Sequence, residues 1–183
     1  MFKRREKVQR GLIRRLRYLW TFELFDSLFL PALAVWLARF LDQPLGVTSI
    51  YAMALTACIL LQGALYWWMR LDGVKRQRRL VRSRFAAFAV LRGINWSLLG
   101  IGGVLLLLAL LRIVPWASSM DGVVAFCFWV LALLEQINYY CWQLMYDCPS
   151  DGDYLRRQKR LRRASLAAIL AGNRRSISTL RKR

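Results

Sequence analysis

Residues 123–146 form an apolar run, VVAFCFWVLALLEQINYYCWQLMY, that is long enough to cross a bilayer. About 20 consecutive apolar residues are needed to span the hydrocarbon core as a helix, so a run of this length predicts a membrane span. Glu135, Gln136 and Asn138 interrupt the run where lipid offers their side chains no hydrogen bonds. The run therefore predicts an integral membrane protein, and its polar residues are the best indication of a function.

Further apolar runs predict three more spans, at residues 18–40, 47–69 and 85–111. Glu23 and Asp26 interrupt the first run, and more spans follow it. We therefore expect a retained signal-anchor helix rather than a cleaved signal peptide. The predicted fold class is an all-α integral membrane protein, in which residues 18–146 form an antiparallel four-helix bundle, up-down-up-down.

Basic segments flank the predicted bundle. Residues 1–17 carry eight Lys or Arg, and apolar residues recur at every fourth position up to Leu16. This pattern predicts either an amphipathic helix lying on anionic headgroups or a solvated arm that only orients the first span. Residues 147–183 form a basic tail, with a second amphipathic helix predicted at 154–171 and ended by Gly172. Both terminal helices are expected at the membrane interface.

The distribution of positive charge predicts the orientation. Eight Lys or Arg lie in the N-terminal arm, seven in residues 70–84 and eleven in the C-terminal tail, out of 29 in the chain. The two turns on the other side carry only Arg39 and Arg112. The positive-inside rule then places both termini in the cytoplasm.

The same distribution accounts for the net charge of +19, so no nucleic-acid partner is expected. The expected partners are the lipid bilayer and its anionic phospholipid headgroups. Homo-oligomers are common for bundles of this size, and a membrane-protein partner is equally compatible with the sequence.

Three spans carry polar pairs at i, i+3 spacing, which places each pair near one helix face. The pairs are Glu23 with Asp26, Arg92 with Asn95, and Glu135 with Asn138. All three pairs fall in the half of the span nearer the basic loops, so we expect one intramembrane polar cluster.

Arg92 is the one cation at this depth, and it is expected to pair with Glu135, Glu23 or Asp26. One cation cannot neutralise three acids, so at least one acid must be protonated, face water or bind something else. Two interpretations follow. The cluster either clamps the four helices together or forms a functional site, such as a proton relay, an ion path or a headgroup pocket.

Glycines are concentrated in the third span, at Gly100, Gly102 and Gly103. In membrane helices glycine usually marks the close approach of another helix. A hinge is the alternative interpretation.

Composition excludes several kinds of chemistry. The chain has no His, which removes imidazole metal or haem ligation and His-based acid–base catalysis. Its four Cys form no C-x-x-C pair. No cofactor, metal site or catalytic residue is predicted, so a membrane enzyme acting on lipid is the least supported class of function.

The last third of the chain carries E-x-x-N-Y-aromatic from Glu135 to Tyr140, followed by D-x-x-Y-L at residues 151–155 and a basic tail. This combination resembles a group of uncharacterised small bacterial four-span membrane proteins. The resemblance implies a bacterial cytoplasmic (inner) membrane location and brings no activity with it.

Three functions remain from the sequence, and a membrane enzyme acting on lipid ranks last; the two ranked above it are as follows. The first is a non-enzymatic accessory or scaffold protein, whose basic cytoplasmic tails bind anionic lipid or a protein partner. The second is a small proton- or ion-coupled transporter or channel that uses the intramembrane acids.

Overall fold

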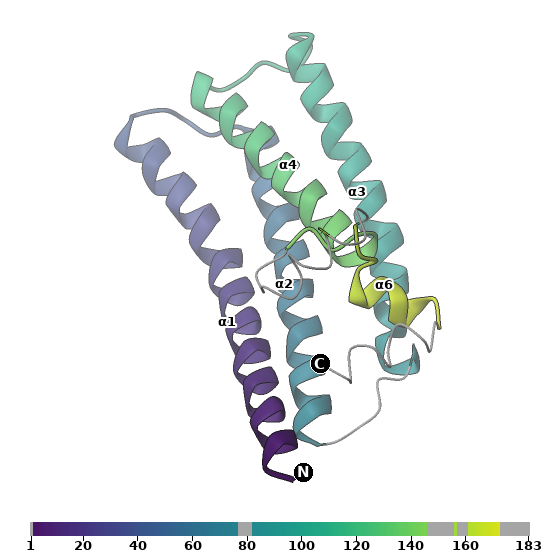
Figure 1. Ribbon diagram of the computed structural model, residues 1–183. Helices are drawn as coiled ribbons and strands as arrows, with labels where there is room; N and C mark the ends of the chain where they lie inside the picture. The colour runs from purple at the N-terminus through teal and green to yellow at the C-terminus, as the bar shows by residue number, and fades with distance from the viewer. Residues whose placement is uncertain (1, 77–81, 146–155, 157–160, 173–183) are drawn as a thin grey trace.

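A computed structural model describes residues 2–76, 82–145, 156 and 161–172 of the chain. Within them lie five α-helices and one short 3-10 helix (Figure 1). Their bounds are α1 Phe2–Phe40, α2 Val47–Lys75, η1 Arg82–Phe85, α3 Ala86–Leu110, α4 Ser119–Tyr140 and α6 Ser165–Leu170.

The four long helices pack as an antiparallel bundle, as predicted. Helices α2 and α4 contact each other extensively and form the centre, while α1 packs mainly on α2 and α3 packs on α4 and α2. Helices α1 and α3 therefore lie on opposite sides of the central pair (Figure 1). We call the end with the α1–α2 and α3–α4 connections the turn end, and the end where α1 begins and α2 and α4 finish the basic end.

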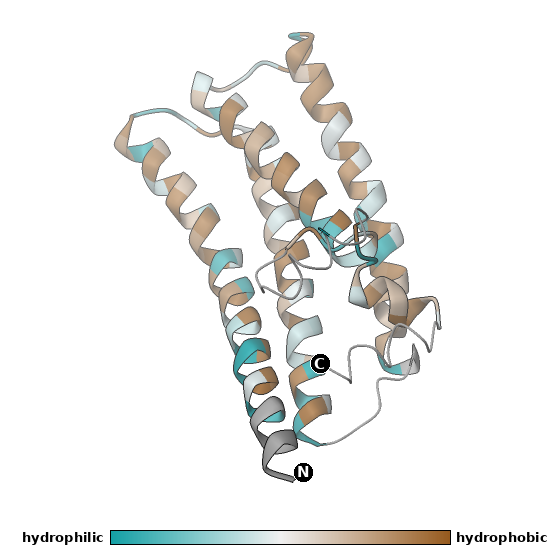
Figure 2. Ribbon diagram, viewed as in Figure 1, coloured by the Kyte–Doolittle hydropathy of each residue, from teal (hydrophilic) through white to brown (hydrophobic). Residues whose placement is uncertain are grey.

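Each of the four long helices is long and apolar enough to cross a membrane. The shortest, α4, has 22 residues and is about 33 Å long, against a hydrocarbon core of about 30 Å. Apolar residues dominate the ribbons through most of their length, and hydrophilic residues gather toward the basic end (Figure 2). The chain is therefore a multi-pass membrane protein.

Two helices extend beyond their predicted spans at the basic end. Helix α1 begins at Phe2, so the N-terminal arm continues the first span instead of forming a separate helix at the interface. Leu16, predicted to face lipid headgroups, is 2% exposed because the extended α1 packs beside α2. Helix α2 continues to Lys75, which replaces the first part of the loop predicted from residue 70. No Pro interrupts either extension.

Helix α4 is shifted from the prediction of 123–146. It begins at Ser119, because the Ser118 hydroxyl accepts the Asp121 N–H at 3.1 Å as an N-cap. It ends at Tyr140, where the chain turns to meet residues 161–164. There the Gln143 N–H donates to the Arg162 carbonyl at 2.8 Å, and Trp142 forms an isolated antiparallel bridge with Arg163.

Helix α6 replaces the predicted tail helix at 154–171. Residues 161–164 are not helical, and the rest of the predicted helix before them, apart from Arg156, lies outside the described residues. The helix ends as predicted, since Gly172 has φ +67° and donates to the Ile169 carbonyl at 3.0 Å.

Helix α6 packs against the bundle, since all its residues from Leu166 to Leu170 are buried. Its apolar side chains join an aromatic cluster drawn from three other helices and η1: Tyr66, Phe85, Phe88, Tyr139 and Tyr140. Arg70, itself 8% exposed, donates to the Ser165 hydroxyl at 3.0 Å and lies over the Tyr66 and Trp67 rings. The C-terminal segment thus closes the basic end of the bundle.

Asp121 holds the turn end together. Its carboxylate is 1% exposed and accepts the Gly46 N–H at 2.9 Å and the Ala117 N–H at 3.0 Å. The Ser118 hydroxyl donates to the Pro44 carbonyl at 2.8 Å. These bonds join the α1–α2 connection to the start of α4, and so fix the relative heights of α2 and α4.

Candidate functional site

The predicted polar residues lie at one level of the bundle, toward the basic end. Glu23 and Asp26 belong to α1, Arg92 and Asn95 to α3, and Glu135 and Asn138 to α4. Direct bonds establish the level, since Tyr139 beside Asn138 reaches Glu23, and Gln136 beside Glu135 reaches Asn95. The structure therefore brings residues from all three pairs near one plane, but it divides them into separate groups.

The first group is centred on Glu23, which is 8% exposed. The Tyr139 hydroxyl donates to its Oε1 and joins α4 to α1 across the bundle. The other oxygen, Oε2, and the indole Nε1 of Trp67 are both buried without a hydrogen bond, although the two side chains face each other. Glu23 thus keeps a buried acceptor oxygen unpaired beside an unpaired donor.

Asp26 and Glu135 lie beside Glu23 at the edge where α1 faces α4. Both are half-buried, and each interacts electrostatically with Glu23. Asn138 Nδ2 donates to Glu135 Oε2 at 3.3 Å, while its Oδ1 accepts the Leu144 N–H at 2.9 Å. Asp26 makes no hydrogen bond or ion pair within the described part of the chain. Three carboxyl groups are therefore gathered, and the donors that bond to them within the described residues, Tyr139 and Asn138, are neutral.

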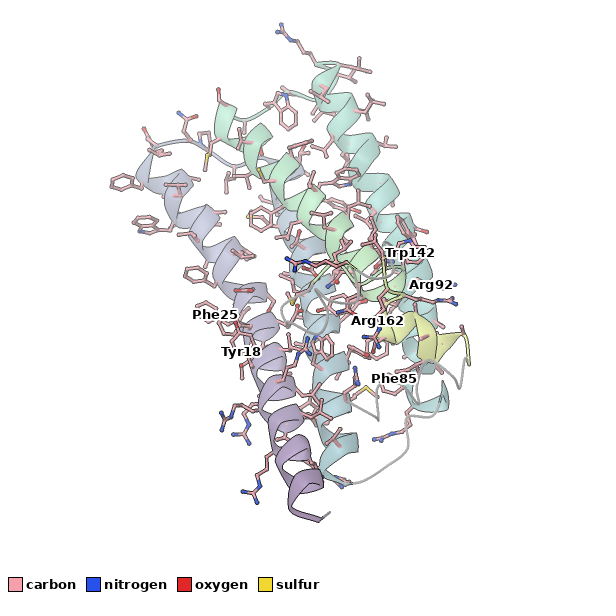
Figure 3. All side chains as sticks on the ribbon, viewed as in Figure 1. Tyr18, Phe25, Phe85, Arg92, Trp142 and Arg162 are labelled. Atoms are coloured by element: carbon pink, nitrogen blue, oxygen red, sulfur yellow. The ribbon has the colours of Figure 1, made fainter. Side chains whose placement is uncertain are left out.

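Arg92 does not join these acids. Its side chain is exposed on α3 and points away from the bundle (Figure 3). No ion pair between Arg92 and an acid occurs among residues 2–76, 82–145, 156 and 161–172. The expected pairing of Arg92 with an acid fails because of the rotation of α3. Arg92 and Asn95 are three residues apart, so their side chains lie about 60° apart around the helix, and only Asn95 points inward. Asn95 therefore faces the core of the bundle, whereas Arg92 lies on the outer surface of α3.

Asn95 instead belongs to a network of neutral amides that links α2, α3 and α4. Its Nδ2 donates to Gln62 Oε1 at 2.9 Å and to Gln136 Oε1 at 3.0 Å, while its Oδ1 accepts from Gln62 Nε2 at 3.1 Å. Gln136 Nε2 donates to the Arg92 carbonyl at 3.3 Å, and the Tyr140 hydroxyl donates to Gln62 Oε1 at 3.2 Å. Asn95 is 1% and Gln136 0% exposed, so the centre of this network is buried, and its bonds are almost fully satisfied.

Sequence reasoning missed Gln62, Tyr139 and Trp67. Gln62 had a usable signal, because it is a polar residue within an otherwise apolar span. The two aromatic residues had none, because Tyr and Trp near the end of a span are equally typical of the membrane interface.

The chemistry available to the site is limited by its side chains. Within the described residues, no three His, Cys, Asp or Glu converge as metal ligands. Carboxyl groups that lie close together in a low-dielectric environment can exchange protons or neutralise a cation, because their mutual repulsion favours either event. The amide network carries no charge, and its bonds are typical of interhelical packing.

Comparisons of the chain with protein families, curated proteins and solved structures find no match. The resemblance of the last span to small bacterial membrane proteins therefore stays a prediction.

Proposed function

We propose that this is a non-enzymatic accessory or scaffold protein of a bacterial cytoplasmic membrane, with both termini in the cytoplasm. In this proposal its basic end binds the headgroups of anionic phospholipids. The observation that carries the proposal is the separation of positive charge between the two ends of a rigid helical bundle.

The charges of the described residues support this orientation. The basic end carries Lys or Arg from α1, α2, η1 and residues 161–164, whereas the helix-flanking cations at the turn end are Arg39 and Arg112. Those at the basic end whose side chains are described include Arg10, Arg14, Arg15, Arg17, Arg70, Lys75, Arg76, Arg84, Arg162 and Arg163. Each Lys or Arg near an anionic surface contributes roughly 1 kcal/mol of attraction.

The internal bonding favours a scaffold over a moving transport path. The amide network joins α2, α3 and α4, and Asp121 locks the opposite end. Buried polar networks that are satisfied in this way make a core rigid. A rigid bundle with a basic surface suits a protein whose work is to hold lipid or a partner in place.

The test measures lipid selectivity in nanodiscs that contain phosphatidylglycerol and phosphatidylcholine. We expect spin-labelled phosphatidylglycerol to be enriched around the wild type. Replacing Arg14, Arg17 and Lys75 by Gln should reduce that enrichment severalfold, because these three side chains are exposed at the basic end. The matched control replaces Arg39 and Arg112, which are exposed at the turn end. Equal loss from both sets, or no enrichment around the wild type, would contradict the proposal.

A small proton- or ion-coupled transporter is the second candidate. It is favoured by the gathering of Glu23, Asp26 and Glu135 without a neighbouring cation in the described part of the chain. Proton flux across a pH step in proteoliposomes tests it. Flux that Glu135→Gln abolishes, in a protein that still folds, would place this candidate first, whereas no flux from the wild type would remove it.

A further inference from the structure

Two faces of the bundle lack a partner within the described chain and carry opposite charges. The first is the small-residue face of α3, which we define as Ala89, Arg92, Gly93, Ser97 and Gly100; the exposed Trp96 lies between Arg92 and Gly100 on the same face. The second is the acidic seam, defined as Asp26 of α1 and Glu135 of α4. Because α1 and α3 lie on opposite sides of the central pair, one copy of the chain cannot bring the two faces together (Figure 1).

Apart from Trp96, the small-residue face has the composition of a helix–helix contact, and no helix of the described chain packs against it. All five members are exposed, and a Cβ added at Gly93 or Gly100 would meet nothing within 4 Å. Gly102 on the other side of the same helix is different, because a Cβ there would lie 2.9 Å from the Trp129 ring and 3.1 Å from the Tyr51 ring. Glycine at Gly102 thus serves packing within the chain, while glycine at Gly93 and Gly100 leaves room for a backbone from outside.

No cation pairs with the acidic seam among the residues that the structure describes. Asp26 has no hydrogen bond or ion pair in the described part of the chain, and Glu135 has only the neutral Asn138 amide at 3.3 Å. Beneath the seam lies Glu23, nine-tenths buried, with its Oε2 unpaired. Three acids at this depth in a membrane favour the approach of a positive group.

The two faces also lie at the same depth. The Arg92 carbonyl accepts a hydrogen bond from Gln136, whose neighbour in the chain is Glu135. A second copy inserted in the same orientation therefore presents its Arg92 at the level of the seam without a shift along the membrane normal. The two faces lie at the same depth, carry opposite charges, and leave space at Gly93 and Gly100. These three separate observations all favour contact between two copies.

We propose that the small-residue face of one copy packs against the acidic seam of a second copy, so that Arg92 pairs with Asp26 or Glu135 of its neighbour. The contact is head-to-tail, because it joins two different surfaces. Each copy then uses its seam toward one neighbour and its small-residue face toward the next, and the assembly grows into a ring or a row. Pairing in this manner satisfies the intramembrane charges that the single chain leaves apart.

The experiment uses the full chain with a C-terminal donor or acceptor fluorescent protein, reconstituted at low density in liposomes. Energy transfer reports association. We expect transfer for the wild type, and a loss of at least tenfold in apparent affinity for Arg92→Gln and for Gly100→Ile. The matched control is Ala54→Ile, an exposed small residue on α2 that lies outside both faces. No atom of the described residues lies within 4 Å of a Cβ added at Gly100, so we expect its substitution to leave the fold of the single copy intact.

Mixing two variants tests the head-to-tail geometry. Arg92→Gln keeps an intact seam, and the double variant Asp26→Asn, Glu135→Gln keeps an intact Arg92. Each should fail to associate alone, yet the mixture should show energy transfer, because one intact contact can form between unlike copies. A wild type that stays monomeric, with Arg92 bound to lipid headgroups, would overturn the proposal. So would association that survives Gly100→Ile, or a mixture that shows no transfer.

Discussion

Asp121 offers the sharpest test of how this bundle is held together. The Asp121→Ala substitution removes a carboxylate that is 1% exposed and that accepts the backbone N–H groups of Gly46 and Ala117 at 2.9 and 3.0 Å. Both bonds have a charged acceptor, and each such bond contributes about 1.5–3 kcal/mol. Gly46 is half-buried and Ala117 is exposed, so water can partly replace the lost acceptor. We therefore take the lower end of the range and expect a loss of about 3 kcal/mol, roughly 100-fold in the unfolding equilibrium.

The assay is reversible unfolding of the purified protein in mixed micelles, titrated with SDS and followed by far-ultraviolet circular dichroism. Gly46→Ala attacks the same lock from the other side, because its Cβ would lie 2.5 Å from Asp121 Oδ2 and 3.2 Å from Ala117 Cβ. The two substitutions should be strongly non-additive, since each breaks the same contact. Gly11→Ala is the matched control, as nothing lies within 4 Å of its added Cβ. A change below about 0.5 kcal/mol for Asp121→Ala, the usual size of a neutral surface change, would refute this account of the turn end.

Three further predictions concern the interior, the C-terminal segment and the orientation. Asn95→Leu removes three side-chain hydrogen bonds. At roughly 0.6 kcal/mol for each bond in a membrane, it should destabilise the bundle by about 2 kcal/mol in the same titration. An unchanged midpoint would contradict the role of the amide network. Ile169→Ala empties a side chain that is 1% exposed and should cost about 2–4 kcal/mol, making the tail more sensitive to protease, whereas an equal effect of Leu161→Ala, which is exposed, would argue against a buried α6. A cytoplasmically active reporter should be active when fused to either terminus and inactive when inserted after Arg112; the reverse pattern would invert the proposed orientation.

The spans and their antiparallel packing could be predicted because both depend on composition averaged over about 20 residues. The ends of the helices could not. The predicted fourth span ran to residue 146 because Cys141–Met145 are mostly apolar, yet the chain leaves the helix at Tyr140 to bond with residues 161–164. That contact joins two segments that are about 20 residues apart in the sequence, and the composition of the fourth span alone does not indicate it.

The depth of the candidate polar residues along their helices could be predicted from the sequence, but their contacts could not. The i, i+3 pattern identified Arg92 and Asn95 as neighbours, but only the rotation of α3 decides that Asn95 enters the core and Arg92 leaves it. That rotation is set by side chains such as Trp129, whose Nε1 donates to the Leu99 carbonyl at 2.9 Å. Asp121 escaped notice for a related reason, since its partners are backbone N–H groups of two separate turns, and backbone donors have no sequence signature.

The burial of α6 has a consequence for the order in which the protein is made. The aromatic site that α6 covers combines Tyr66 of α2, Phe88 of α3 and Tyr139 of α4. Ser165 also shares a hydrogen bond with Tyr66, which lies 99 positions earlier in the chain. This aromatic site is therefore complete only after all four spans have entered the membrane, and α6, which covers it, is synthesised after them. Until then the aromatic cluster is uncovered at the basic end. A nascent chain that stalls before residue 165 therefore exposes these apolar aromatic side chains to the quality-control machinery of the cell.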